Sequence, residues 1–163
     1  MPRGVSLAVV LALGLVATAC AGEKKQRAKP TDGDSIVVAG ENANDHGTEA
    51  VAGVPEFELE LDEFYFSPTV LSGEAGQTIS LELLNNGSNV HTFTVDAVNV
   101  DVEVQPGQNA FTKVTFPESG AFLFYCRFHA GGGMRGGLSV GGDLTAVDGT
   151  EGGGGDTQMG PYG

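Results

Sequence analysis

Between residues 55 and 142, apolar and polar residues alternate with a period of two. The clearest run covers residues 98–104, where four valines alternate with polar or acidic residues, and similar runs cover residues 57–62, 79–83, 122–126 and 138–140. Successive side chains of a β-strand point to opposite faces, so each run predicts a strand with one buried and one solvated face. No segment shows the 3.6-residue period of an amphipathic helix. The chain is therefore expected to bury its apolar residues by packing sheets.

Turn-forming residues separate these runs at regular intervals. They include Ser67-Pro68, Asn85-Asn86-Gly87, Pro106-Gly107 and Ser119-Gly120. Several short strands at this spacing predict an all-β fold, with two sheets packed as a β-sandwich. We expect one such domain over residues 55–142, because about ninety residues suit a single small core and nothing larger.

The first twenty residues have the pattern of a secretory signal. Arg3 precedes an apolar run over residues 5–17, and small residues then lead to Cys20. We predict a signal peptide over residues 1–19; an uncleaved membrane anchor is the alternative, although the run is short for a transmembrane helix. The sequence Ala17-Thr18-Ala19-Cys20 resembles the lipobox of bacterial lipoproteins. That resemblance implies that Cys20 becomes an acylated N-terminus, which would anchor the chain to a membrane.

The segments on either side of the domain are predicted to be flexible. Residues 20–54 are rich in Gly, Asp, Asn and Ala, show no clear period and begin with a small basic cluster at 24–29. We interpret them as a linker that holds the domain away from the membrane, with His46 as a solvated residue. Residues 143–163 include four consecutive glycines at 152–155 and are predicted to be a disordered tail.

Composition excludes several classes of protein. The chain carries 8 Lys and Arg against 21 Asp and Glu, a net charge of −13, whereas a nucleic-acid-binding domain needs a basic face. Its two cysteines, Cys20 and Cys126, could in principle pair, but a disulfide framework needs more. Three histidines and two cysteines, without clustered pairs, do not make a zinc finger or ribbon.

Residues that bind soft metals cluster near the end of the predicted domain. Cys126, His129 and Met134 lie within nine residues, in a glycine-rich loop between two apolar strands. A thiolate, an imidazole and a thioether together favour copper, and the glycines let the backbone return Met134 to the same centre. His91, just after the turn at residues 85–87, supplies the second nitrogen of a His₂Cys site with a weak axial Met.

Other readings of these residues are weaker. Each residue alone is ordinary: an inward Cys is usually a small core residue, and a Met near a strand usually serves packing. Zinc is disfavoured because Met is a poor zinc ligand. A nucleophilic Cys/His pair would need a helix N-terminus or a positive site to stabilise the thiolate, and neither is evident. With no paired carboxylates and no Ser/His/Asp order, we do not expect an enzyme.

Together these motifs resemble the cupredoxins, the small blue copper proteins. The resemblance is carried by Phe66-Ser67-Pro68, Gly76-Gln77-Thr78-Ile79, the turn at 86–91, Pro106-Gly107 and Tyr125-Cys126-x₂-His129-x₄-Met134-x-Gly136. It implies a Greek-key β-sandwich holding one type 1 copper ion. His91, Cys126 and His129 would be the equatorial ligands and Met134 the axial ligand. His129 would lie under an apolar patch through which electrons pass. Thr92 stands where the family commonly has Asn, and Phe128 where it often has Pro.

The cupredoxin resemblance implies a carrier of single electrons, and the predicted signal and lipobox place it outside the cytoplasm and tethered to a membrane. A copper-binding protein for storage, delivery or tolerance is the alternative, although such proteins favour Met- or His-rich clusters and this chain has three Met in total. A third reading is a sandwich that serves as an interaction module, which would not need all four ligands.

Charge bears on the partner of such a carrier. Residues 55–142 contain three basic and eleven acidic residues, a net charge of −8. An acidic carrier is steered toward a basic surface, at a rate that falls as salt rises. We expect a monomer whose partner is a cytochrome or a copper oxidase with a basic docking patch.

Overall fold

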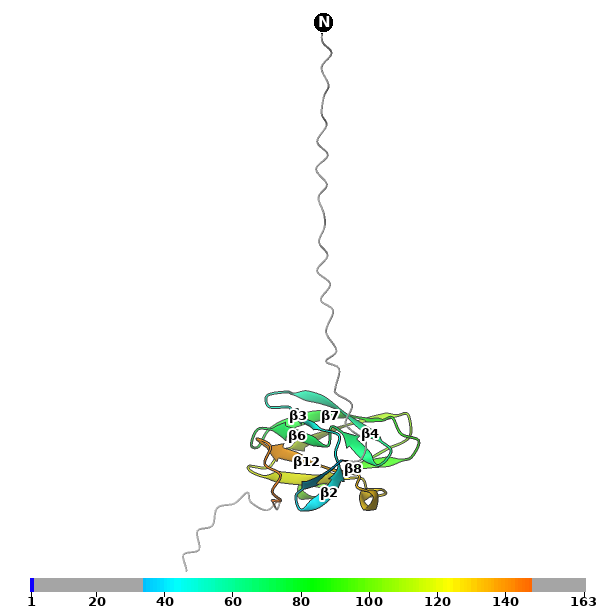
Figure 1. Cartoon of the computed structure of the whole chain (residues 1–163), viewed down its shortest axis with the longest axis vertical. Coiled ribbons are helices and arrows are strands. Elements are labelled where there is room, and N and C mark those ends of the chain that lie inside the picture. Colours follow the sequence, from blue (N-terminus) through cyan, green and yellow to red (C-terminus); the bar gives the residue numbers. More distant parts are fainter. Residues whose placement is uncertain (2–33, 148–163) are drawn as a thin grey trace, which may run out of the picture.

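Two β-sheets face each other in the computed structural model of the chain, which describes Met1 and residues 34–147 (Figure 1). The four-stranded sheet has the order β10 (Asn109–Thr115), β7 (Thr78–Asn85), β4 (Glu56–Asp62) and β5 (Tyr65–Ser67). The six-stranded sheet has the order β3 (Thr48–Ala50), β6 (Val70–Gly73), β12 (Arg135–Val140), β11 (Ala121–Tyr125), β8 (His91–Val95) and β9 (Val100–Val104). The other described elements are the hairpin of β1 (Ser35–Val38) and β2 (Glu41–Asn44) and two 3₁₀ turns, η1 (Asp96–Val98) and η2 (Ala130–Gly132).

The core lies between the sheets and is built by the alternating residues. Leu59 and Leu61 of β4, and the inward residues of β7 and β11, are buried, whereas Glu60 between the two leucines is partly exposed. Aromatic rings fill the centre, with Phe66 edge-on to Phe124 at a centroid separation of 5.0 Å. The predicted all-β sandwich is confirmed. The apolar residues of each alternating run lie on the strand face that packs against the other sheet.

The chain passes back and forth between the two sheets. β10 lies in the four-stranded sheet although β9 and β11 both lie in the other one, so β8 and β11 become neighbours. They pair antiparallel at Tyr125 and Thr94, while β11 also pairs with β12 along its whole length. This crossing brings the residue after β11 next to the first residues of β8.

The linker predicted for residues 20–54 is wrong for residues 34–54. β3 pairs in parallel with β6, and Val51 N–H donates to Ser72 O at 2.8 Å. Val38 and Ala43 of the β1–β2 hairpin are buried against Val70. The apolar residues of this segment do not alternate with polar ones, yet Val38, Ala43 and Val51 are buried at the edge of the sandwich. The folded part therefore includes at least the twenty residues before Pro55, from Ser35 onward.

The predicted tail also begins later than residue 143. Ala39 N–H donates to Leu144 O at 2.8 Å, and Ala121 N–H donates to Thr145 O at 2.7 Å. These bonds hold residues 143–147 against the folded part. The predicted signal peptide, Cys20, the basic cluster and residues 148–163 lie outside the described residues. Among residues 34–147, no helix has the length and apolar character needed to cross a bilayer.

Two strand predictions need adjustment. The strand β10 was not predicted, because Phe111 and Lys113 face solvent and only Val114 is fully buried in the core. The run predicted from residue 98 begins two residues later, at Val100. Residues 96–98 form η1 instead, and Asn99 ends that turn in the left-handed conformation with φ 53°. Asn tolerates this conformation better than most residues.

We predict that Gly136→Ala strongly destabilises the fold. A Cβ at Gly136 would overlap Thr69 O and the ring of Phe124, so backbone and a packed core ring would both have to move. Overpacking of this kind costs about 1–3 kcal/mol. Gly131→Ala is the matched control, since a Cβ there meets nothing within 4 Å. Urea denaturation of both variants measures the difference; equal stabilities would contradict the packing described here.

Candidate metal centre

Three potential ligands converge at one end of the six-stranded sheet. His91 is the first residue of β8, Cys126 follows β11 directly, and His129 lies in the loop before η2. The Sγ of Cys126 lies 3.8 Å from Nδ1 of His91 and 3.5 Å from Nδ1 of His129. The two Nδ1 atoms are 3.1 Å apart. The structure thus brings together the three residues predicted as equatorial ligands.

The separations of these three atoms fit a single metal ion. Metal–nitrogen bonds of about 2.0 Å and metal–sulfur bonds of about 2.3 Å, opened by 110–120°, place S and N about 3.5–3.7 Å apart. The same angles place two nitrogens about 3.3–3.5 Å apart. The observed distances of 3.5, 3.8 and 3.1 Å lie close to these values. Three lone pairs therefore face one centre at the spacing that coordination requires.

The centre is largely removed from water. His91 and Cys126 are fully buried, and His129 is half-buried. Burial, and secondarily the charge of His129, lowers the pKa of His91, so the neutral ring with a free lone pair is favoured. The Nε2 atom of His91 is buried without a hydrogen-bond partner among the described residues. Neutral imidazole and thiolate are the forms that bind a metal.

Met134 returns to the base of the ligand loop, as the glycine-rich sequence predicts. Its carbonyl accepts a hydrogen bond from Cys126 N–H at 3.1 Å, and its own N–H donates to His129 O at 3.2 Å. The side chain is fully buried in the same core cluster as Cys126. The role of Met134 as axial ligand remains a prediction.

Thr92 joins the two strands that carry His91 and Cys126. Its backbone N–H donates to Cys126 Sγ at 3.3 Å, and its Oγ1 accepts a hydrogen bond from Arg127 N–H at 2.8 Å. The first bond stabilises negative charge on sulfur, and the second fixes the backbone just after Cys126. A threonine hydroxyl thus links the two ligand segments at the position where the resemblance predicts an Asn.

Glu63 holds the loop that leads to His91, and the sequence analysis did not identify it. One carboxylate oxygen accepts hydrogen bonds from Ser88 N–H and Ser88 Oγ–H, and the other accepts one from Asn89 Nδ2–H at 2.8 Å. These bonds lower the pKa of Glu63 to about 2. No period or motif indicated this role, because Glu63 and Ser88 meet only when the β4–β5 turn folds against the loop before β8.

Two aromatic side chains frame the half-buried His129. Phe64, in the β4–β5 turn, lies edge-on to the His129 ring with centroids 5.0 Å apart, and Phe128 is also edge-on to it, with centroids 6.3 Å apart. Both are exposed, at 45% and 53%. Phe64 stands in the left-handed conformation with φ 66°. The only half-exposed ligand of the three therefore sits in an apolar surface.

The remaining predicted residues lie elsewhere. Cys20, predicted to carry the lipid, lies outside the described residues. His46, predicted to be a solvated linker residue, instead stacks on Tyr65 with ring centroids 3.5 Å apart, and it is not part of the metal-binding group.

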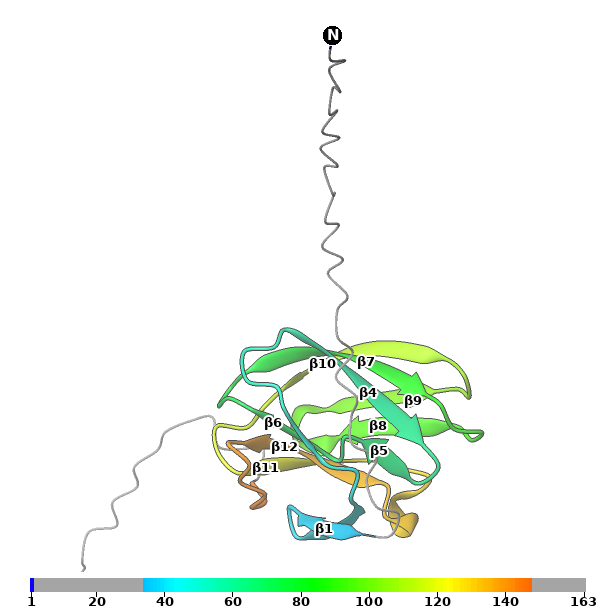
Figure 2. The same cartoon turned by 45° about the horizontal axis from the view of Figure 1, so that its top comes forward.

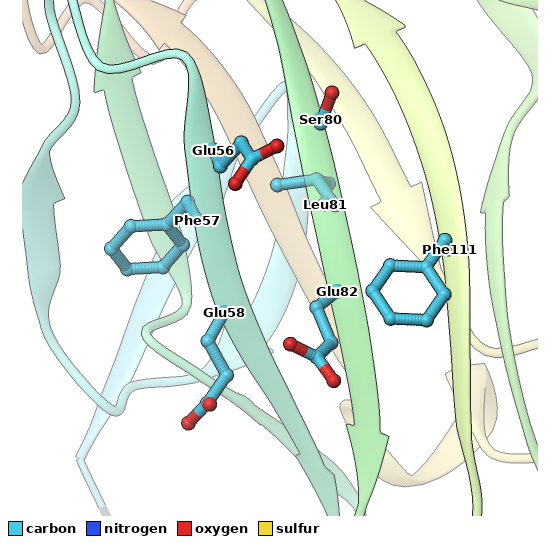
Figure 3. Close-up of a pocket in the computed structure, with 7 residues that line it drawn as sticks. All are labelled: Glu56, Phe57, Glu58, Ser80, Leu81, Glu82 and Phe111. Atoms are coloured by element: carbon cyan, nitrogen blue, oxygen red, sulfur yellow. The ribbon is translucent and has the colours of Figure 1, made fainter.

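A separate hollow of about 200 Å³ lies on the four-stranded sheet. Figure 3 shows that β4, β7 and β10 contribute its walls, with Glu58, Glu82 and Phe111 side by side. Neither His nor Cys lines it. Its carboxylates contribute to the acidic surface and do not extend the metal centre.

Comparisons with known proteins agree with this geometry. The family model of the cupredoxin-like domain matches residues 11–140. Plastocyanin A/B from Petroselinum crispum is 34% identical over 85 residues, covering 46% of this chain and 86% of that protein. Plastocyanin from Daucus carota is 35% identical with the same coverage. The chain belongs to the cupredoxin-like family, so the resemblance drawn from its motifs is confirmed.

A solved structure of dithionite-reduced auracyanin from Roseiflexus castenholzii is also similar. It has a TM-score of 0.46 and 19% identity, over 52% of this chain and 95% of that chain.

The cofactor of this family is one copper ion, and the donor set of this chain fits it. A thiolate and two imidazoles in a compact, buried group are the ligands that copper favours, and His91, Cys126 and His129 provide them. The prediction of copper as cofactor is therefore confirmed.

We predict that Glu63→Gln removes a pH-dependent part of the stability. The folded-state pKa of about 2 lies below the ordinary value of 4.5, so the stabilising effect is complete above pH 4.5. It is lost as the pH falls from 4.5 toward 2, when the folded chain must also take up the proton. Urea denaturation of the metal-free chain across this range should show a steeper loss for wild type than for Glu63→Gln. Glu58→Gln, on the outer face of β4, is the control; parallel curves for wild type and Glu63→Gln would contradict the assignment.

Proposed function

We propose that this protein carries single electrons between redox partners through one copper ion, and that it does so outside the cytoplasm, tethered to a membrane. The observation that carries the proposal is the buried His91–Cys126–His129 group, of which only His129 approaches the surface. Bound copper supplies the Cu(I)/Cu(II) couple. The role of the chain is to hold the ligands in fixed positions and to leave the metal accessible to a partner only on the side of His129.

The surroundings of the three ligands suit fast electron transfer. Thr92 and Glu63 fix the two segments that carry His91 and Cys126, so the ligand atoms have little freedom to move when the charge of the site changes. Burial excludes water that would otherwise reorganise around that charge. Phe64 and Phe128 surround His129 with an apolar surface, against which a partner could dock at short range.

The membrane tether belongs to the same proposal. An apolar run after Arg3 and the Ala17-Thr18-Ala19-Cys20 box support export followed by acylation of Cys20. Residues 21–33 would then separate the lipid from β1. Because β1 already starts at Ser35, this spacer contains fewer residues than the linker predicted over residues 20–54. The carrier would therefore work close to the membrane surface.

A redox protein with a basic docking surface is the proposed partner. The acidic residues of the sandwich favour it, and Asp101 and Glu103 near Arg127 illustrate how carboxylates outnumber their cationic neighbours on this surface. Long-range attraction of this kind raises the association rate and weakens with added salt. A cytochrome or a copper oxidase fits this description.

Copper binding should give the protein an intense blue colour. Thiolate-to-copper charge transfer from Cys126 is the expected source, and a mild reductant should bleach it reversibly. The measurement is a titration of the purified protein with Cu(II), followed by visible absorption. Cys126→Ser should abolish the band, and a colourless copper complex of the wild-type protein would contradict the carrier function.

Variation of Met134 in the same titration tests the axial position. Met134→Gln should keep the blue band, because the three equatorial ligands remain, and should shift the reduction potential. Cyclic voltammetry measures that shift. A variant with the wild-type potential would remove Met134 from the ligand set.

For the anchor, Cys20→Ala should release the protein from membranes. Without the acylated cysteine only weak contacts of the basic cluster would remain. Fractionation of cells into membrane and soluble parts, with a blot for the protein, gives the readout. Retention of Cys20→Ala in the membrane fraction would favour the uncleaved helix instead.

A further inference from the structure

Asn44, the last residue of β2, contacts the ligand loop and the rim of His129 together. Its Nδ2 donates to Phe64 O at 2.8 Å and to Gly132 O at 2.9 Å. Its backbone N–H donates to Gly133 O at 2.9 Å. Because both side-chain bonds end on carbonyl oxygens, only the NH₂ end of the amide can make them.

These contacts join three segments that are far apart in the sequence. Gly132 lies 88 residues and Phe64 lies 20 residues from Asn44. Figure 2 shows the β1–β2 hairpin and the loop that carries η2 at the same end of the sandwich. Asn44 itself is held from behind, because its carbonyl accepts a hydrogen bond from Thr69 Oγ1 at 2.8 Å. The amide is thus a fixed point between the hairpin and the loop.

Gly133 allows this close approach. Its φ of 89° is the left-handed conformation that favours glycine, and a Cβ there would lie 2.5 Å from Asn44 Oδ1. The loop that separates His129 from Met134 therefore packs directly on the Asn44 side chain. Arg135, just beyond Met134, adds a contact to the same hairpin through Glu41 at 3.5 Å.

We propose that Asn44 is a positioning residue that clamps the loop between His129 and Met134 and holds Phe64 against His129. The β1–β2 hairpin is then a working part of the metal centre. The clamp has two separate consequences. The loop between His129 and Met134 opens less often, and Phe64 stays packed against the His129 ring. The proposal deepens the proposed function and rests on it for the copper readout alone.

Amide hydrogen exchange in the metal-free full-length chain tests the clamp directly. Loss of two hydrogen bonds in Asn44→Ala should speed exchange at Gly132, Gly133 and Met134 about five- to ten-fold. Amides of β7, in the far sheet, should keep wild-type rates. Asn44→Asp keeps the shape of the side chain but replaces the donor by oxygen, so it should speed exchange at least as much.

Copper release to a chelator, followed by the blue band, supplies a second readout. Asn44→Ala and Asn44→Asp should release copper about five- to ten-fold faster than wild type. Asn42→Ala is the matched control, because Asn42 is an exposed residue on the same strand and the same side. It should stay within two-fold of wild type in both experiments.

The outcomes separate the clamp from the function. Wild-type exchange rates at residues 132–134 in both Asn44 variants would overturn the clamp, whatever the copper result. Faster exchange spread evenly over β7 and the loop would also overturn it, since that pattern reports general destabilisation. A wild-type chain that binds no copper would overturn the proposed function, while the exchange experiment would still decide the role of Asn44.

Discussion

The adjacency of β8 and β11 is the constraint on which the metal centre depends. His91 and Cys126 are 35 residues apart in the chain, and two further strands lie between the elements that carry them. They meet because β10 joins the opposite sheet and leaves β11 free to lie beside β8. The ladder between these strands is short, with one registered pair, so side-chain bonds complete it. Thr92 provides them in both directions, to the Cys126 sulfur and from the Arg127 backbone.

The β4–β5 turn supports the centre from the other sheet. Glu63 in this turn binds the loop before His91, and Phe64 beside it packs on His129. His91 on β8 and His129 in the ligand loop are therefore both supported from a single turn. The hairpin of β1 and β2 closes this arrangement from outside, where Asn44 reaches both Phe64 and the ligand loop. The centre is thus contacted by peripheral segments as well as by the core.

Burial distinguishes two inner ligands from one ligand near the surface. His91 and Cys126 lie within the apolar core, where a neutral ring and a sulfur with one N–H donor are the stable forms. His129 lies at the boundary between this core and solvent, framed by exposed aromatic rings. The sandwich carries far more acidic than basic residues, whereas the rim around His129 presents the exposed rings of Phe64 and Phe128. Electrostatic attraction and close apolar contact can therefore act at different distances.

Strongly alternating segments of the sequence predicted the sheets well, since inward residues such as Leu59 and Leu61 report a buried face directly. The prediction missed the strands that bury only one or two apolar residues. Val38 and Val51 are fully buried, but the first lies in a continuous apolar run and the second lies between two alanines. Neither segment alternates, so the first strands looked like a linker. In β10, exposed Phe111 hid the alternation. A strand that is buried by segments distant in the sequence need not show a local hydrophobic period.

For the metal centre, the sequence by itself determined which atoms are available. Cys126, His129 and Met134 share one loop, and their chemistry selects copper with His91 as the fitting partner. Only the tertiary structure decided that His91 arrives within 4 Å of the sulfur, that His129 alone of the three ligands meets the surface, and that Thr92, Glu63 and Asn44 hold the loops. The physical reason is that ligand identity is a property of single side chains. Their spacing and exposure depend on hydrogen bonds and packing between segments up to 88 residues apart.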